Sequence, residues 1–394
     1  MALFFKRRDP NAPPPPPKSK TREWTDSLVF AIVAATLIRW ATFEAYTIPT
    51  PSMEDTLLVG DYLFVSKLHY GPITPQTPLQ VPLSHQTVPI FGFKSYSDAI
   101  QLPTYRFPGF SEVKRNDVVV FHVPFEAQYP ADLRTNYIKR CVAVAGDVLE
   151  IRDRKLYVNG QLAPTPGQQE SKYFLRIPEA NDEVTRVFRE QGIVEYRNVA
   201  TGDPVLQDVP GYGLGYEVDM TPEKAEYFRK QPFVKEVIAE TIEAGKPEVN
   251  QAVFPDNPDY PFTLNAPNAP GLRHWNKDNY GPITIPKEGQ TVQLTPKTVP
   301  LYYKAILRYE HNDGITLKDS TIFQNGQPLT SYTFKQDYYF MMGDNRHDSL
   351  DSRFWGFVPA DHIVGKAVLI WLSVDPFADF AHKIRWSRLF NVIH

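Results

Sequence analysis

The chain has 394 residues, of which 42 are lysine or arginine and 45 are aspartate or glutamate, so its formal net charge at pH 7 is −3. This length is enough for one large or two ordinary domains, and the slightly acidic balance does not favour a nucleic-acid-binding surface. The single cysteine, Cys141, excludes an intrachain disulfide and a cysteine metal cluster. The 37 prolines, 25 phenylalanines and 21 tyrosines favour strands and structured loops, which indicates a mainly β fold.

The first 45 residues have the composition of a membrane anchor behind a basic tail. Residues 1–23 contain six lysines and arginines and a run of five prolines, which we expect to be extended. Residues 24–45 are apolar apart from Asp26, Arg39 and Glu44, and a bilayer needs about 20 residues of helix, so they are predicted to form a transmembrane anchor. Because basic residues precede this segment, we expect the rest of the chain to lie outside the cytoplasm.

Two other interpretations of the apolar segment are open. A buried core helix or an interfacial helix is favoured by Arg39, which is charged and must reach an interface to be tolerated in a span. A cleaved signal peptide is disfavoured, since no small-x-small cleavage site follows the segment.

The next part of the chain alternates between β-rich segments and turns. Strands are indicated by β-branched and aromatic runs, and turns by glycine with asparagine or aspartate. In chain order the expected elements are strands at 57–59 and 62–67, a proline-rich surface loop at 71–111, a strand at 118–123, a strand pair at 137–149, and a hairpin at 155–160.

Residues 161–336 contain no motif typical of catalysis. We predict one helix there, with Thr221 as N-cap and Pro222 at the first helical position, ending near Arg229. A second hairpin is expected at 321–327, around an Asn-Gly turn. The apolar run 364–374 is too short to span a bilayer and is predicted to be a buried strand.

Ser52 follows directly on the apolar segment and is a candidate nucleophile. Pro49 and Pro51 restrict the backbone on either side of it. In an extended segment Thr50 and Ser52 share a face, so the Thr50 hydroxyl and the Ser52 backbone N–H would supply two donors to an oxyanion. Taken alone, such a serine is more often a turn residue. A Ser-x-x-Lys motif is excluded, because position 55 is Asp55.

Lys139 is the candidate base. A serine hydroxyl is a weak nucleophile until a base takes its proton, and a lysine can act as that base if desolvation keeps it neutral. Lys139 lies in an apolar sequence between Ile138 and the run that follows Arg140. The other interpretation is a lysine on an edge strand, where its charge prevents aggregation.

A polar run extends from Gly343 to Arg353 and contains three aspartates. Such a run is usually a solvated loop, and a calcium loop is disfavoured because the terminal glutamate is missing and basic side chains interrupt the run. Because Met341 and Met342 precede it and Trp355 follows it, we predict a buried polar network. The histidines are scattered without the spacing of a metal site.

These segments, in this order and behind an anchor, resemble a bacterial type I signal peptidase. The resemblance covers about residues 46–160 and 337–394 together with the anchor. It implies a membrane-anchored, mainly β catalytic domain made of those two parts, a large inserted second domain at 161–336, and no cofactor. Pro51 and Asp55 depart from the residues that many members have at these positions.

The resemblance also implies roles for single residues. Ser52 and Lys139 would form the catalytic dyad, with Thr50 and Ser52 as oxyanion donors. Ser349 would hydrogen-bond to the lysine and orient it. The supporting residues would be Asp344, Asp351 and Arg353, of which the last two would pair. The substrate pocket, suited to small side chains at −1 and −3, would be formed by Ile48, Met53, Leu57, Leu63, Val120 and Ile138.

We therefore expect a single-pass endopeptidase of the bacterial cytoplasmic membrane that removes signal peptides from exported preproteins on the extracytoplasmic side. Its expected partners are preproteins, the lipid bilayer and, by proximity, the secretion translocon. One alternative is a soluble repressor-type protease that cleaves itself with the same pair; the anchor and the lack of a helix-turn-helix pattern disfavour it. The other is an inactive membrane-bound binding or assembly protein on a peptidase scaffold, which retention of Ser52, Lys139 and Ser349 disfavours.

Overall fold

The computed structural model describes most of the chain and is mainly β, as predicted. The tail predicted at 1–23 lies almost entirely outside the described residues. These are 19–88, 91–164, 169–179, 182–193, 205–248, 252–255, 275–318, 320–376, 378–379 and 382–393.

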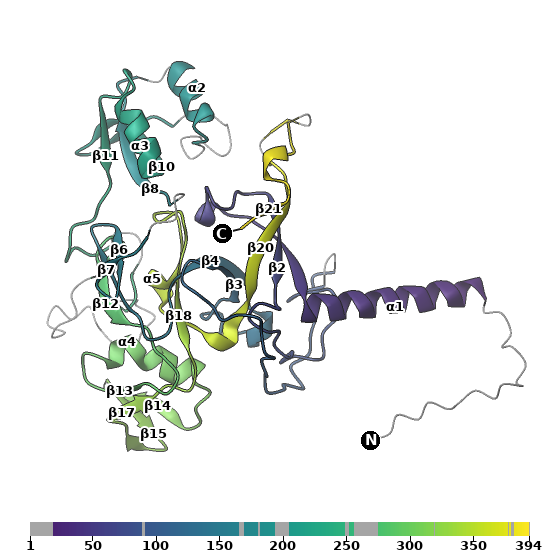
Figure 1. Ribbon diagram of the computed structural model, residues 1–394. Helices are drawn as coiled ribbons and strands as arrows, with labels where there is room; N and C mark the ends of the chain where they lie inside the picture. The colour runs from purple at the N-terminus through teal and green to yellow at the C-terminus, as the bar shows by residue number, and fades with distance from the viewer. Residues whose placement is uncertain are drawn as a thin grey trace, which may run out of the picture.

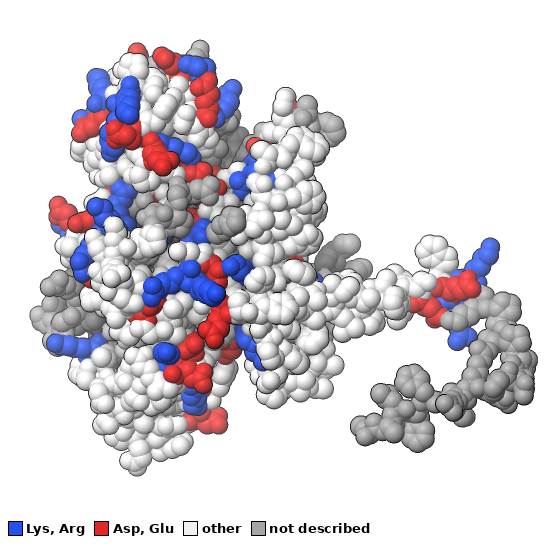
Figure 2. All heavy atoms as spheres, in the orientation of Figure 1, with Lys and Arg blue, Asp and Glu red and all other residues white. Residues whose placement is uncertain are grey.

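The apolar N-terminal segment forms one helix, α1 (Lys20–Ala41), which projects away from the β-rich body (Figure 1). Ser19 caps it by accepting from the Arg22 N–H, and none of its residues is buried. The helix is long and apolar enough to cross a membrane. Figure 2 shows its middle free of charged side chains, which gather at its outer end. It ends at Ala41 because the next residues pair as a strand, β1 (Phe43–Thr47).

The largest sheet combines strands from the start, the middle and the end of the chain. Its order is β1-β2-β20-β3-β4-β18-β19, with β21 paired to β20. The neighbouring strands whose register is given run antiparallel, so the sheet brings residues 43–66 next to residues 363–373. The remaining bounds are β2 Asp61–Ser66, β3 Val118–His122, β4 Asn136–Ala143, β18 Tyr338–Met342, β19 Val358–Pro359, β20 Ile363–Ser373 and β21 Asn391–Val392.

The middle of this sheet is buried on both faces, because successive side chains of β3 point to opposite sides and both sides are covered. Val118 and Val120 belong to one buried cluster, whereas Val119 and Phe121 belong to another. Cys141 is buried in the second cluster, so its thiol is shielded. The strands predicted at 118–123 and 364–374 are confirmed as β3 and β20.

The strand predicted at 57–59 is wrong. The Leu57 N–H donates to the Met53 carbonyl at 2.7 Å, and the Leu58 N–H donates to Asp61 Oδ2 at 2.9 Å. These local bonds fold the backbone into a turn, and the strand begins only at Asp61. Leu57 is nonetheless fully buried, so its apolar side chain packs in the core although its backbone is in a turn.

A separate unit, here called the α3 unit, has its own apolar core and lies at one end of the body (Figure 1). Its four-stranded sheet has the order β11-β8-β10-β9. The helix predicted from Thr221 to Arg229 is confirmed as α3, with the cap and the first-turn proline in place. The bounds are β8 Ser171–Arg176, α2 Asp182–Glu190, β9 Gln207–Val209, β10 Gly213–Met220, α3 Pro222–Arg229 and β11 Glu236–Ala239.

Most of the remaining elements share a core with residues of β4 and β18. A second four-stranded sheet, β12-β5-β6-β7, contains the predicted hairpin, which turns at Asn159 and Gly160 with positive φ at both residues. The hairpin predicted at 321–327 is also confirmed. The bounds are β5 Val148–Arg152, β6 Lys155–Val158, β7 Gln161–Leu162, β12 Tyr280–Thr284, β13 Thr291–Gln293, α4 Val299–Lys304, a π-helix Ala305–Tyr309, β14 Ile315–Lys318, β15 Thr321–Gln324, β16 Gln327–Pro328, β17 Ser331–Thr333 and α5 Ser352–Trp355.

The prediction of a single helix in 161–336 is wrong, since α2 and α4 also lie there. In α2, Val184, Val187 and Phe188 are buried on one face at helical spacing. The other side chains of α2 are polar, so its sequence offered only one short apolar face from which to predict a helix. Four of the six residues of α4 are buried, so tertiary packing stabilises it.

Candidate active site

Ser52 lies in a short turn between two strands of the largest sheet. The segment Pro51–Met53 forms a single 3₁₀ turn, with a proline at its start. Ser52 is therefore not in an extended segment, and the prediction that it alternates with Thr50 on one extended face is wrong. Thr50 itself is extended and exposed, whereas Ser52 is only 9% exposed.

Lys139 points at Ser52 from the middle of β4. Its Nζ lies 2.5 Å from Ser52 Oγ, and its side chain is 4% exposed. Burial lowers the pKa of Lys139 from 10.5 to about 8, although Asp351, Asp344 and Asp348 act in the opposite direction. A low-dielectric site disfavours the ammonium form, so a substantial neutral fraction exists near neutral pH.

The interpretation of Lys139 as a lysine whose charge guards a sheet edge is wrong, because its side chain is buried and directed at Ser52. Its strand lies between β3 and β18 in the sheet order, and β18 pairs with it only from Arg140 to Ala143. The Tyr137 ring, whose centroid is 5.5 Å from Lys139 Nζ, is close to the amine. The buried amine is not hydrated, whereas the charged side chains that protect edge strands from aggregation are exposed to solvent.

The polar run 343–353 directly follows β18, the neighbour of the lysine's strand, and contacts the Ser52 segment. The Asn345 N–H donates to the Ser52 carbonyl at 3.3 Å. At Gly343 a Cβ would collide with the Ser52 carbonyl oxygen and with Ser349 Oγ, so only glycine allows this close approach. The structure thus places Ser349 next to the backbone of Ser52.

The predicted hydrogen bond from Ser349 to Lys139 is not present. Ser349 Oγ is buried and has no hydrogen-bond partner within the described part of the chain. The amine is directed at Ser52 Oγ instead. A hydroxyl that is buried without a partner is unusual, because desolvation normally requires a compensating bond. Ser349 therefore lies close to the backbone of Ser52 but does not hold the Lys139 amine.

Asp344 anchors the polar run to the strand that carries the lysine. Arg140 donates to both of its carboxylate oxygens, from Nε at 2.8 Å and from Nη2 at 2.7 Å. The Thr56 hydroxyl donates to Asp344 Oδ2 at 2.7 Å. Arg140 and Asp344 are almost fully buried, so this is a bidentate pair inside the fold. Sequence reasoning missed both Arg140 and Thr56. For Arg140 the signal was a charged residue inside an apolar strand, and for Thr56 there was none.

The structure brings Asp351 and Arg353 together, as expected. Arg353 donates from Nε at 2.9 Å and from Nη2 at 2.8 Å, and the Gly343 N–H donates to Asp351 Oδ2 at 3.1 Å. Burial alone would raise the pKa of Asp351, but Arg353 outweighs it and the pKa is lowered. Asp351 therefore stays ionised and holds the start of the run beside Ser52.

The six apolar residues proposed as pocket walls lie in one cluster. Ile48, Met53, Leu57, Leu63 and Val120 are at most 3% exposed, and Ile138 packs against them while partly exposed. Tyr46, which sequence reasoning omitted, is the other partly buried member. Ile138 and Tyr46 are therefore the members of this cluster whose side chains retain some exposure.

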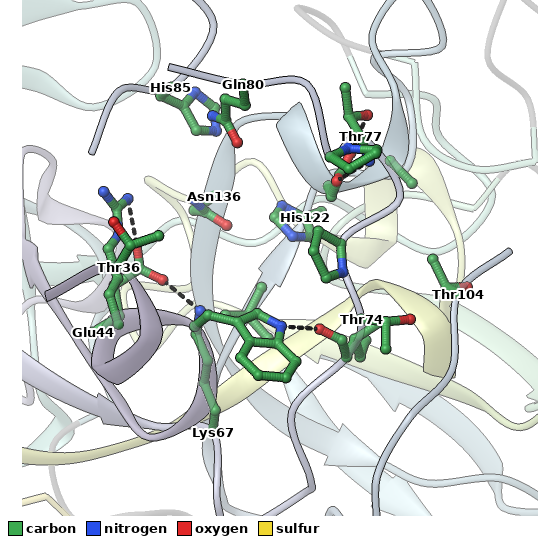
Figure 3. Close-up of a pocket in the computed structure, with 18 of the residues that line it drawn as sticks. Thr36, Glu44, Lys67, Thr74, Thr77, Gln80, His85, Thr104, His122 and Asn136 are labelled. Carbon is green, nitrogen blue, oxygen red and sulfur yellow. Dashed lines mark hydrogen bonds and ion pairs between the residues drawn. The ribbon is translucent and has the colours of Figure 1, made fainter. Parts of the chain in front are cut away.

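A pocket of about 620 Å³ lies where α1 meets the sheet (Figure 3). Its lining includes Tyr46 and Asn136, so it adjoins the apolar cluster, and the proline-rich segment 73–85 forms another wall. Glu44 pairs with Lys67 at 2.9 Å and with Arg39 at 2.5 Å. The loop predicted at 71–111 therefore borders a cavity at the end of the apolar helix.

Within the described residues no group of three or more histidine, cysteine, aspartate or glutamate side chains is arranged to hold a metal ion.

Comparison with known proteins gives a consistent family match. The profile described as "Signal peptidase, peptidase S26" matches residues 21–203 and 284–372. A signal peptidase I of Haemophilus influenzae is 26% identical over 96% of this chain and 77% of its own length. A signal peptidase I of Buchnera aphidicola subsp. Acyrthosiphon pisum is 24% identical over 87% of this chain and 72% of its own length. A signal peptidase I of Aquifex aeolicus is 24% identical over 88% of this chain and 82% of its own length.

Proposed function

The chain belongs to the signal peptidase family, peptidase S26, and on that basis we propose that it removes signal peptides from exported preproteins with Ser52 as nucleophile and Lys139 as general base. The observation that carries this proposal is the 2.5 Å contact between Lys139 Nζ and Ser52 Oγ in a buried site. Burial lowers the pKa of Lys139 to about 8, and a neutral amine at that distance can accept the hydroxyl proton.

Acylation transfers a proton and replaces the scissile amide bond of the substrate with an ester bond to Ser52. Lys139 Nζ takes the proton from Ser52 Oγ as the oxygen attacks the scissile carbonyl carbon. The tetrahedral intermediate collapses when the C–N bond breaks, and the ammonium returns its proton to the leaving amine. The mature protein leaves with a free N-terminus, and the signal peptide stays esterified to Ser52. Water, deprotonated by the same lysine, then hydrolyses the ester.

The oxyanion requires donors that are already in place. We propose the Ser52 backbone N–H and the Thr50 hydroxyl, since Thr50 is the N-cap of the turn that holds Ser52 and its side chain makes no capping hydrogen bond there. Preorganised donors of this kind stabilise developing charge by about 2.7–4 kcal/mol each. Pro51, which lies between them, has no N–H to contribute.

The substrate can bind as an additional strand. Among the described strands β1 pairs only with β2, so its other backbone edge is open. Strand β18 pairs with β4 only from Arg140 to Ala143, which leaves residues 136–139 open on that side. A peptide between these two edges would gain main-chain hydrogen bonds. Its small residues at −1 and −3 would contact the apolar cluster around Ile48 and Ile138.

The pocket at the end of α1 is suited to the part of the signal peptide that emerges from the bilayer. It joins the helix end to Tyr46 and Asn136, which border the proposed cleft. We propose that α1 anchors the chain in the bacterial cytoplasmic membrane, with the sheets on the extracytoplasmic side near the translocon. Exposed aromatic residues such as Trp386 and Phe390, 69% and 70% exposed, suit contact with a bilayer interface.

The decisive experiment is cleavage of a preprotein by the detergent-solubilised protein, followed by sequencing of the new N-terminus. Cleavage after a small residue, together with its loss in Ser52→Ala, would support the proposal. A serine-reactive lipopeptide should label Ser52 in the parent protein. Intact preprotein and no labelling, with a folded chain, would instead indicate an inactive scaffold.

A further inference from the structure

The α3 unit reaches the candidate active site through Glu170, the residue just before β8. The Glu170 backbone N–H donates to the Asp344 carbonyl, and the Arg346 N–H donates to the Glu170 carbonyl, both at 2.9 Å. These bonds form a parallel bridge between Glu170 and Asn345. Glu170 is 2% exposed, so the unit contributes a buried carboxylate to the back of the polar run beside Ser52.

Lys224, in the first turn of α3, lies between this carboxylate and a second one. Its Nζ is 3.3 Å from Glu170 Oε1 and 3.3 Å from Asp55 Oδ1. Burial opposes the charge on Lys224, but Glu170 and Asp55 outweigh it and raise its pKa, so the amine stays cationic. The Thr221 hydroxyl accepts from the Lys224 N–H at 3.3 Å, which fixes the helix turn that presents the amine.

Asp55 belongs to the segment that carries the nucleophile. It lies three residues after Ser52, at a φ of +68°, a left-handed conformation that aspartate tolerates better than most residues. The next residue, Thr56, donates to Asp344. One ammonium therefore connects the Ser52 segment with the strand that supports the polar run, and it comes from a unit in which the sequence shows no catalytic motif.

We propose that Lys224 is a positioning residue of the active site: by bridging Asp55 and Glu170 it holds the Ser52 segment and the polar run in register, and so couples the α3 unit to catalysis. This inference rests on the proposed peptidase function for its kinetic consequences. Its structural consequence, the order of the polar run, stands apart from any activity.

The test compares Lys224→Met with Lys224→Arg. Methionine keeps an unbranched stem but removes the ammonium that bridges the two carboxylates, whereas arginine keeps the charge. We expect Lys224→Met to lower kcat on a preprotein by about 10- to 100-fold, the range for a small misplacement of reacting groups. KM should change by less than about threefold, since no substrate contact is removed. Lys224→Arg should retain most of the activity.

The matched control is Lys230→Met, which removes an exposed lysine from the C-cap of the same helix and should leave kcat unchanged. Asp55→Asn weakens the same bridge from its other side, because asparagine removes the charge of Asp55 and also tolerates a positive φ. It should lower kcat in the same direction, even if Lys224→Met fails to fold.

Hydrogen exchange in peptides that cover 343–347 gives a readout that needs no activity. In Lys224→Met the amides of Asn345 and Arg346, which donate to Ser52 and Glu170, should exchange at least about tenfold faster. Faster exchange in a chain that cleaves nothing would support the bridge and refute the peptidase. Unchanged exchange and unchanged kcat in both Lys224→Met and Asp55→Asn would overturn the inference. An equal loss in Lys230→Met would overturn it too.

Discussion

Because burial lowers the pKa of Lys139 to about 8, we expect the rate of cleavage to follow the neutral fraction of this one amine. The sign is fixed by the chemistry: only the unprotonated lysine accepts the Ser52 proton, so activity rises with pH. With a pKa of about 8, the neutral fraction is about 9% at pH 7, about half at pH 8 and about 90% at pH 9. The rate should rise about tenfold over that interval and then level off.

A solvated lysine predicts a different curve. With an unperturbed pKa of about 10.4, the neutral fraction rises about 100-fold between pH 7 and pH 9 without levelling off. The two cases therefore differ both in the size of the rise and in the presence of a plateau.

The assay is kcat/KM for an internally quenched signal-peptide substrate between pH 6 and pH 10.5, because this ratio reports the ionisations of the free enzyme. Circular dichroism at each pH separates ionisation from unfolding. Lys139→Arg provides the blank at every pH. A midpoint near 10, or a profile that keeps rising beyond pH 9, would refute the assignment of a buried general base.

Further expectations concern residues around the dyad. Lys139→Arg should be inactive, because arginine keeps its proton at accessible pH. Lys139→Met should also be inactive. Its free energy of unfolding at pH 7, measured by denaturant titration, should nevertheless exceed that of the parent by on the order of 3 kcal/mol, since the substitution removes an amine whose charged form burial disfavours. Ser349→Ala should leave the unfolding temperature unchanged in a thermal melt, because its hydroxyl makes no hydrogen bond in the described structure. Ser352→Ala should instead lower the unfolding temperature, since its hydroxyl accepts from the buried Met341 N–H at 3.0 Å. Arg140→Leu leaves a buried aspartate unpaired and should destabilise the fold by about 3–5 kcal/mol in a denaturant titration.

The sequence was most informative where a short segment determines its own conformation. The helix Pro222–Arg229 carries its cap and its first-turn proline within a few residues. The hairpin at Asn159 and Gly160 needs only two residues with positive φ. The apolar run that became β20 and the segment that became α1 follow from composition and length. In each case the signal and the structure lie within the same stretch of chain.

Local signals were less reliable where a few side-chain bonds compete with propensity. The strand expected at 57–59 is a turn, because Asp61 accepts from the Leu58 N–H before the strand can begin. The extended geometry expected at Ser52 is a 3₁₀ turn that begins at Pro51. Only the folded chain shows which of two locally acceptable conformations its neighbours stabilise.

Within the candidate site the sequence named the residue types, and tertiary structure decided their partners. Ser52 and Lys139 could be singled out from their motifs, but 87 positions separate them and only the sheet brings the amine to 2.5 Å from the hydroxyl. Asp344 pairs with Arg140 across 204 positions, and Lys224 meets Asp55 across 169. Ion pairs of this kind depend on burial and on the direction of single side chains. Neither is encoded in the residues that flank them, so these contacts follow from the fold as a whole.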